Sequence, residues 1–247
     1  MSDFNERIEK LNELIAKSER IVFFGGAGVS TESGIPDFRS KDGLYNNRGV
    51  EFEKYDPEYL LSIDCLNSKP EVFFEFYRQK LDCRNVEPNI THRVLADMEK
   101  RNKLLAVITQ NIDGLHQKAG SENVYEVHGT TLKNYCRRCN KPYDKNYIFN
   151  CNQDIPKCEC GGVIRPDVTL YGEMLPNDAW NRSTEAISKS DLLIVGGTSL
   201  SVYPAANLIS NCFGNLVLIN RDKTQYDDYA DIVFHENLGE VFSKINY

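Results

Sequence analysis

The sequence has no long hydrophobic run and no excess of positive charge, and each absence excludes a class of protein. No stretch approaches the roughly 20 uninterrupted apolar residues that a helix needs to cross a bilayer. The first residues are acidic and amphipathic, without the cationic and then apolar order of a secretory signal. Lysine and arginine total 29 against 36 acidic residues, a net charge of -7, which disfavours nucleic acid as the primary ligand. We therefore predict a cytoplasmic protein that binds no membrane and whose acidic surface suits a basic peptide partner.

The 247 residues contain enough apolar material for one α/β core and a small accessory lobe, since 41% are hydrophobic and 11% are aromatic. Four short apolar runs, each followed by glycine or polar residues, predict buried strands. The apolar side chains of residues 4, 8, 11 and 14 recur at helical spacing, which predicts an amphipathic helix before the first strand. The four predicted strands cover residues 21–24, 104–109, 192–195 and 216–219.

Helix-length segments separate these runs, as in parallel βαβ units that are covered on both faces. We predict an α/β fold: a doubly wound, parallel, Rossmann-like sheet with a smaller inserted lobe, made of a helical segment and a module with four cysteines. Ligands of such sheets bind beyond the carboxyl ends of the strands, so one site is expected where the polar residues after the runs meet. The predicted dinucleotide-binding domain comprises residues 1–39, 85–132 and 166–247, and the small lobe comprises the helical insertion 40–84 and the zinc-binding insertion 133–165.

Four of the eight cysteines form two close pairs, Cys136 with Cys139 and Cys158 with Cys160. Two close pairs in a chain without a secretory signal indicate a zinc site rather than disulfides. Four thiolates fill every position of a tetrahedral zinc ion, so the metal would be structural. The second pair is one residue shorter than the usual spacing, which keeps Cys151 as a reserve ligand. The other cysteines are expected to be reduced thiols: Cys65, Cys83 and Cys212.

Gly26, Ala27 and Gly28 follow the first predicted strand and would let backbone amides approach a pyrophosphate. A helix that starts near Ser30 would add its positive end. The pattern is weak on its own, because Thr31 stands where the usual dinucleotide fingerprint has a third glycine. A purely structural turn is the alternative interpretation.

The residues that follow carry a resemblance to a known family. The run from Gly26 to Arg39 resembles the cofactor loop of sirtuins, residues 109–116 (TQNIDGLH) resemble their second signature, and His128 with Gly129 resembles the third. The similarity continues through residues 170–173, 197–200 and 202–205. As an ordered set these motifs span essentially the whole chain.

The resemblance implies that NAD is a co-substrate of protein lysine deacetylation. Nicotinamide leaves, the acyl oxygen of a modified lysine attacks the exposed ribose carbon, and free lysine and O-acetyl-ADP-ribose are formed. By position, His128 is the base that takes a proton from a ribose hydroxyl. An unperturbed imidazole has a pKa of about 6.5 and is largely neutral at pH 7, which suits this role.

The resemblance also assigns the NAD contacts. Ile112 and Asp113 would hold the carboxamide of nicotinamide, Phe38 would shield the reacting ribose, and Arg39 would order the loop. Asn220 would contact the adenosine ribose, and Leu238 would cover adenine. The full implied set is Gly26, Ala27, Gly28, Thr31, Asp37, Phe38, Arg39, Gln110, Asn111, Ile112, Asp113, His128, Gly196, Thr198, Ser199, Asn220 and Leu238.

By the same resemblance, the acetylated peptide would bind as an extended strand to Val168, Tyr171, Gly172 and Glu173. The family often has Phe at the position of Tyr171. Sirtuins that remove acidic acyl groups carry a Tyr and an Arg three residues apart. Here Lys80 stands at the Arg position and lacks its bidentate fork, so neutral acyl groups are expected over succinyl. The oligomeric state is open, and a monomer is compatible with the sequence.

Three other functions are alternatives to deacetylation. Mono-ADP-ribosyl transfer uses the same cleaved NAD but delivers the sugar to a protein nucleophile. A hydride-transferring dehydrogenase is disfavoured by the missing fingerprint glycine. A non-enzymatic zinc-bearing module that senses NAD or acyl-lysine would not need His128, Asn111 and Asp113 together.

Overall fold

A computed structural model describes residues 2–247 and has a six-stranded sheet at its centre, in the order β3-β2-β1-β7-β8-β9. Every neighbouring pair of strands in this sheet is parallel. The four predicted strands are confirmed to within one residue at each end, and the predicted fold class is confirmed with them. The strands are β1 (Ile21–Gly25), β2 (Leu104–Thr109), β3 (Val124–Glu126), β7 (Leu192–Gly196), β8 (Asn215–Ile219) and β9 (Ile232–Phe234).

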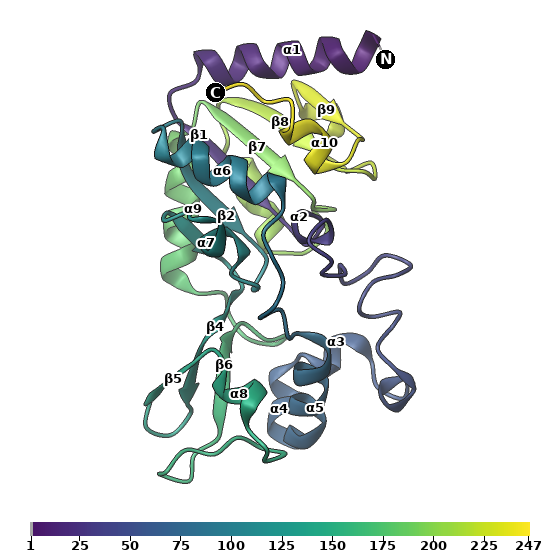
Figure 1. Cartoon of the computed structure of the whole chain (residues 1–247), viewed down its shortest axis with the longest axis vertical. Helices are drawn as coiled ribbons and strands as arrows, with labels where there is room; N and C mark the ends of the chain where they lie inside the picture. Colours follow the sequence, from purple (N-terminus) through teal and green to yellow (C-terminus); the bar gives the residue numbers. More distant parts are fainter. Residues whose placement is uncertain (1) are drawn as a thin grey trace.

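Helices cover both faces of this sheet (Figure 1). Alternate residues of β1 enter different cores: Ile21 and Phe23 pack with α1, α6 and α10, whereas Val22 and Phe24 pack with α9 and the 3-10 helix η2. A strand that is buried on both faces must be apolar at every position, which explains the continuous runs in the sequence. The covering helices are α1 (Ser2–Lys17), α6 (Ile90–Lys100), α7 (Leu115–Ala119), α9 (Asn177–Lys189), η2 (Ala205–Asn211) and α10 (Leu238–Phe242).

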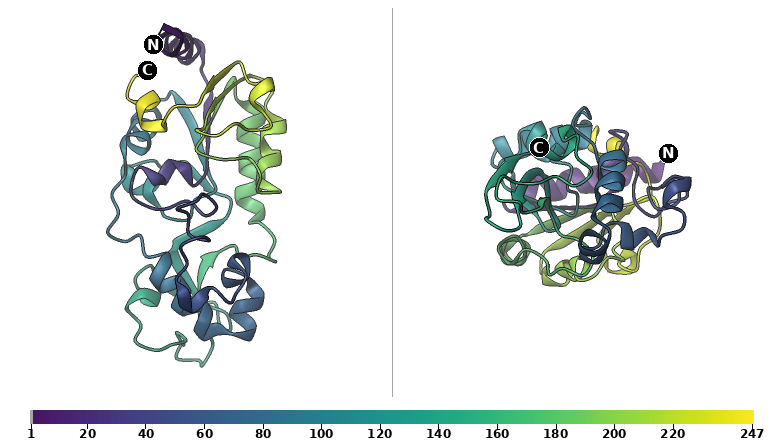
Figure 2. Two further views of the ribbon diagram at one scale, coloured as in Figure 1. Left: turned by 90° about the vertical axis from the view of Figure 1, so that its right-hand side faces the viewer. Right: turned by 90° about the horizontal axis from the view of Figure 1, so that it is seen from below.

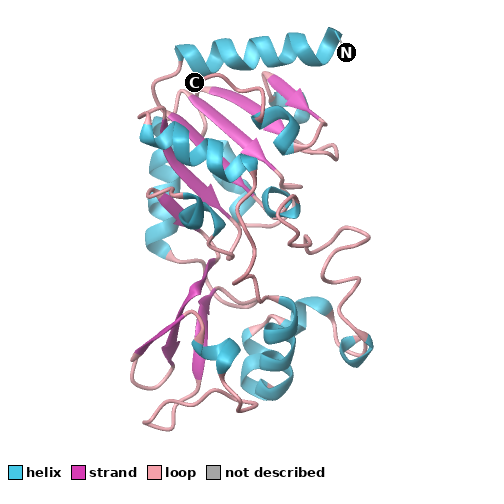
Figure 3. Cartoon of the chain, in the orientation of Figure 1, coloured by secondary structure: helices cyan, strands magenta, loops and turns pink. Residues whose placement is uncertain are grey.

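The small lobe lies beyond the carboxyl ends of the large sheet and combines helices with a three-stranded antiparallel sheet of order β5-β4-β6 (Figure 3). Aromatic side chains from its helices and its strands share one core. The domain boundaries given above stay a prediction. Its elements are η1 (Val50–Phe52), α3 (Pro57–Leu60), α4 (Ile63–Ser68), α5 (Pro70–Lys80), β4 (Gly129–Cys136), β5 (Pro142–Asp144), α8 (Tyr147–Asn150) and β6 (Ile164–Val168).

The strand order reverses its direction between β1 and β7, and two glycine-rich loops meet there. The Gly28 amide donates to the Gly197 carbonyl at 2.8 Å. A Cβ atom on Gly28 would lie 2.7 Å from the Gly197 Cα, and Gly197 itself has a φ of +60°. Larger residues would push the two loops apart, so glycine is required at both positions. Such a reversal point is where open α/β sheets bind their ligands.

None of the described helices is long and apolar enough to cross a membrane. All eight cysteines are free of disulfide bonds. The remaining short elements are α2 (Gly28–Thr31), which follows the first glycine loop, and η3 (Asp227–Tyr229), which precedes β9. The left view of Figure 2 shows both chain termini at the end of the molecule opposite the small lobe.

Candidate active site

A cavity of about 1160 Å³ lies between the carboxyl ends of the large sheet and the small lobe. Loops that follow β1, β2, β6, β7 and β8 all contribute to its lining, together with the segment before α10. Pockets for one small ligand usually measure about 300–1,000 Å³. The cavity is therefore large enough for two ligands side by side.

Nearly all of the residues predicted to bind NAD or peptide line this cavity, and two predicted NAD contacts lie elsewhere. Asp113 lines a smaller neighbouring cavity of about 130 Å³, which shares Phe38, Asn111 and Ile112 with the large one. Gly196 is the last residue of β7, where a Cβ atom would meet Leu238 and Phe23, and Gly197 lines the cavity in its place. The cavity-lining predictions are Gly26, Ala27, Gly28, Thr31, Asp37, Phe38, Arg39, Gln110, Asn111, Ile112, His128, Thr198, Ser199, Asn220, Leu238, Val168, Tyr171, Gly172 and Glu173.

The loop after β1 offers amides rather than a helix end. α2 starts at Gly28, two residues before the expected position, and has only four residues. One turn sums few peptide dipoles, so its macrodipole is small. The Gly26 and Gly28 amides donate to the Gly196 and Gly197 carbonyls, so the Ala27 amide between them is the loop group that suits a pyrophosphate here.

His128 stands between β3 and β4, where its ring borders the cavity. Its Nδ1 atom lies 3.0 Å from the main-chain oxygen of Gln110. A carbonyl oxygen only accepts, so Nδ1 carries the proton and Nε2 keeps a free lone pair. Burial lowers the pKa of His128, and the Gln110 carbonyl opposes this only in part. The ring is therefore neutral at pH 7, with a basic nitrogen available for a proton.

Asp113 is held by the first turn after the glycine loop. Its Oδ2 accepts from the Ser30 hydroxyl at 2.7 Å, and Oδ1 accepts from the Leu115 amide at 2.8 Å. The Asn111 side-chain amide in turn donates to the Ser30 hydroxyl at 3.0 Å. Burial raises the pKa of Asp113, while the bonds from Leu115 and Ser30 lower it in part. Ser30 thus joins the β1 and β2 loops, a role that sequence reasoning missed because it saw only a helix start.

The Tyr171 hydroxyl connects the loop after β6 with the loop after β1. It accepts from Arg39 Nη2 at 3.1 Å and lies 2.8 Å from the Tyr45 hydroxyl. Arg39 also pairs with Glu58 at 3.0 Å. Burial, and next the neighbouring Tyr171, raises the pKa of Tyr45 far above its usual value, so this hydroxyl keeps its proton. Tyr45 was also missed, because a lone tyrosine in an aromatic-rich segment carries no signal in the sequence.

The turn around Glu173 is fixed by a buried ion pair. Arg165, whose side chain is 5% exposed, donates to both carboxylate oxygens of Glu173, at 2.5 and 2.8 Å. The Leu170 amide donates to the same carboxylate at 2.9 Å. Burial by itself raises the pKa of Glu173, but the guanidinium and the amide outweigh it and the pKa lies below its usual value. The carboxylate stays ionised and holds the turn that borders the cavity.

Four sulfur atoms converge in the small lobe, away from the cavity. The Sγ atoms of Cys136, Cys139, Cys158 and Cys160 all lie within 4.8 Å of one another. Individual pairs are separated by 3.5 and 3.7 Å. Four thiolates at about 2.3 Å from one zinc ion would be about 3.8 Å apart, so the arrangement fits a tetrahedral site. The reserve ligand Cys151 is not part of this cluster.

The sequence model of the "Sir2 family" matches residues 26–204. This range contains the two glycine-rich loops after β1 and β7, His128 and the four clustered cysteines. The chain belongs to this family. Among relatives named NAD-dependent protein deacetylase, one from Clostridium tetani is 53% identical, with 96% of both chains covered. The Clostridium perfringens relative is 51% identical and covers 98% of this chain and 99% of its own.

Solved Sir2 structures share the fold. A Sir2 complex with a p53 peptide and NAD+ has a TM-score of 0.84 at 37% identity, with 96% of each chain covered. A Sir2 complex with a deacetylated p53 peptide and 3'-O-acetyl-ADP-ribose has a TM-score of 0.87 at the same identity and coverage. A Sir2 structure with a propionylated peptide has a TM-score of 0.84 at 36% identity.

Proposed function

We propose that the chain is an NAD-dependent protein lysine deacetylase that transfers the acetyl group to ADP-ribose and releases nicotinamide. One observation carries the proposal: His128, which has a basic nitrogen, lines a cavity shared by the glycine loop after β1 and the turn after β6. The relatives named NAD-dependent protein deacetylase support the activity over almost the full length of the chain.

NAD would lie along the carboxyl ends of the strands. The Ala27 amide would bind the pyrophosphate, and Thr198 and Ser199 would add hydroxyl donors on the β7 side. The adenosine half would reach Asn220 and Leu238, and the nicotinamide half would enter the smaller cavity toward Ile112 and Asp113. When bound, NAD supplies an anomeric carbon that becomes electrophilic as nicotinamide leaves.

The residues of the chain then act on the two substrates. His128 Nε2 would accept a proton from a ribose hydroxyl, which makes that oxygen a nucleophile. Phe38 would exclude water from the reacting carbon, and Asp113 would accept from the carboxamide of nicotinamide. Because the Gln110 carbonyl fixes the tautomer, the ring is oriented before the substrates bind.

The peptide would pass between the loops after β6 and β7, with the acyl-lysine pointing toward the ribose. Acetyl and other neutral acyl groups are expected over succinyl. Lys80 Nζ already donates to the Asn47 carbonyl at 3.2 Å, and a single ammonium cannot form a bidentate pair with a carboxylate. Acetylated proteins of a bacterial cytoplasm are the proposed partners.

Zinc would hold the small lobe together through Cys136, Cys139, Cys158 and Cys160, and it would supply a structural crosslink and no open coordination position. Eight free cysteines and a thiolate site suit a reducing compartment, which supports the cytoplasmic location.

The proposal is tested by incubating the purified chain with an acetyl-lysine peptide, with and without NAD, and weighing the products. The expected result is loss of acetyl only with NAD, with one nicotinamide released per lysine. A peptide that gains ADP-ribose would instead support mono-ADP-ribosyl transfer. An unchanged peptide in the presence of NAD and zinc would overturn the proposal.

A further inference from the structure

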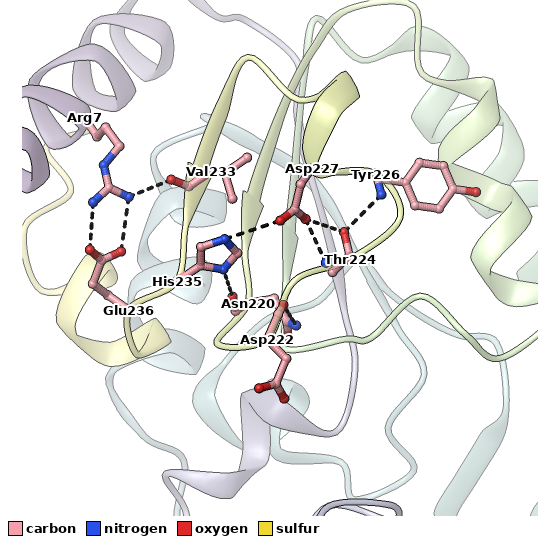
Figure 4. A network of polar contacts seen from close by, with 9 residues as sticks. All are labelled: Arg7, Asn220, Asp222, Thr224, Tyr226, Asp227, Val233, His235 and Glu236. Atoms are coloured by element: carbon pink, nitrogen blue, oxygen red, sulfur yellow. Dashed lines mark hydrogen bonds and ion pairs between the residues drawn. The ribbon is translucent and has the colours of Figure 1, made fainter.

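A polar network at the carboxyl ends of β8 and β9 lies outside the residues assigned so far (Figure 4). Its centre is His235, which follows β9. Its other members come from three distant segments: Arg7 on α1, Asn220 after β8 and Asp227 on η3. Neither His235 nor Asp227 is among the described residues that line the cavity. Any effect of the network on the cavity must therefore pass through other residues.

The His235 ring bridges two groups that can only accept hydrogen bonds. Nδ1 lies 2.9 Å from the main-chain oxygen of Asn220, and Nε2 lies 3.3 Å from Asp227 Oδ2. A neutral imidazole has one N–H and can donate to one of them, whereas the doubly protonated ring can donate to both. The Asp227 side chain is 8% exposed, so its carboxylate depends on hydrogen bonds from the protein in place of water.

Asp227 is itself held in place. Its Oδ1 accepts from the amide and the hydroxyl of Thr224, at 2.9 and 2.6 Å. Its Oδ2 is buried and has no hydrogen-bond partner apart from the ion pair with His235. The carboxylate is therefore a fixed anchor for the ring, not a mobile surface charge.

The ring joins two stretches that line the cavity. Residues 219–222 line it on the β8 side and residues 236–238 line it on the α10 side. His235 directly precedes the second stretch and bonds Asn220 in the first. Asn220 is further held by its amide, which donates to the Phe234 carbonyl at 2.9 Å, and by its side chain, which donates to the Asp222 carbonyl at 2.7 Å.

A second clamp holds the same segment from the other side. Arg7 donates to both carboxylate oxygens of Glu236, at 2.8 and 3.3 Å, and to the Val233 carbonyl at 2.7 Å. This ion pair ties the N-terminal helix to the start of the α10 stretch. The His235 ring is the side-chain contact from the start of this stretch to Asn220, and it adds to the main-chain bond between the Asn220 amide and Phe234.

The geometry points to His235 and Asp227 as positioning residues for NAD, which hold the Asn220 stretch and the 236–238 stretch at the spacing that the adenosine half requires. The inference rests on the proposed function, because it presumes that NAD occupies the cavity. It predicts a specific effect on NAD affinity and none on the proton transfer at His128, which lies in a different loop.

The test uses the full zinc-loaded chain with His235→Ala and Asp227→Asn. Asp231→Asn is the matched control, because Asp231 Oδ2 accepts from the Leu216 amide at 2.8 Å at the opposite end of the same two strands. The dissociation constant of NAD is measured by calorimetry, and KM and kcat are measured with an acetyl-lysine peptide. Two independent variants keep the test valid if one of them fails to fold.

We expect His235→Ala and Asp227→Asn to raise the dissociation constant and the KM for NAD about three- to tenfold, with kcat and the peptide KM changed less than about twofold. The Asp231→Asn control should lower Tm without changing NAD affinity.

Unchanged NAD affinity in the folded variants, or an equal change in the Asp231 control, would overturn the inference. A parent chain that binds NAD without deacetylating the peptide would refute the proposed function alone, because the calorimetric comparison needs no turnover. A parent chain that does not bind NAD would refute both.

Discussion

The six-stranded sheet and the small lobe are held together by different means. The sheet buries apolar side chains on both faces, in two separate cores that helices complete. The small lobe has one aromatic core between short helices and a three-stranded sheet, and four converging thiols join its hairpin to the segment before β6. We expect burial to stabilise the first region, and a zinc ion on the four thiols to add to the stability of the second. Substitutions in the sheet, in the small lobe and in the cavity between them, here called the joint, should therefore have different effects.

The largest effect is expected at the joint, where His128→Ala should lower kcat about a thousandfold because the base is lost. Neither core contains this side chain, so Tm should be nearly unchanged and NAD should still bind. In the parent chain, the pKa of His128 is lowered by burial. The pH at which kcat/KM declines on the acid side should therefore lie below 6.5, the usual pKa of an imidazole. Retention of a tenth or more of the turnover would refute His128 as the base.

The second largest effect is expected from loss of a zinc ligand, which should disturb the small lobe and leave the large sheet folded. Cys160→Ser removes one of four zinc ligands, so the small lobe should lose its metal and activity should fall about a hundredfold or more. The single tryptophan, Trp180, lies on α9 over the large sheet, so its fluorescence should stay native. Cys151→Ser is the matched control, because that thiol lies outside the cluster. A zinc-free variant with full activity would contradict the comparison.

The large sheet should show a pH dependence of its own. His92 and His116 are buried with ring centroids 4.6 Å apart, between α6 and α7. Burial lowers the pKa of both, to about 4 for His92, with Arg93 adding to the effect on His92 and His92 adding to that on His116.

The unfolded chain binds a proton at each ring near pH 6.5, whereas the folded chain does not until lower pH, so stability is lost as pH falls. For His92 this amounts to about 3 kcal/mol between pH 6.5 and about 4. Denaturant titrations followed by Trp180 fluorescence at several pH values would measure it. His92→Gln should show a shallower slope, and an equal slope would exclude His92 as the cause.

The smallest effect is expected from Tyr171→Phe, which removes the hydroxyl between the loops after β1 and β6 but keeps the ring. Arg39 keeps its pair with Glu58, so the loss is one shared hydrogen-bond partner. We expect the KM values of both substrates to rise about two- to fivefold, with kcat within about twofold. Tyr59→Phe in the same lobe, which loses only a bond to Ser68, should leave both KM values unchanged. If the two variants behave alike, Tyr171 does not couple the loops.

Much of the site could be predicted from the sequence because motifs are local. The glycine loop, the residues around Asn111 and the turn before Glu173 each lie in one continuous segment and line the cavity as expected. Gly196 was predicted to contact NAD, but it packs against Leu238 and Phe23 at the end of β7. The next residue, Gly197, lines the cavity instead, so a local motif located this contact only to within one residue. Tyr45 and His235 lie outside every motif, and Ser30 lies inside one that indicated only a helix start. The roles of all three depend on partners in other loops.

The amino-acid sequence by itself determined the parallel sheet, the positions of its central strands and the two cysteine pairs that meet in the small lobe, because apolar runs and short spacings are properties of continuous segments. Only the tertiary structure decided which proton His128 carries, which hydroxyl holds Asp113 and which residues brace Asn220. Those contacts join groups 18, 83 and 15 residues apart along the chain, and such distant groups meet only after the core has folded.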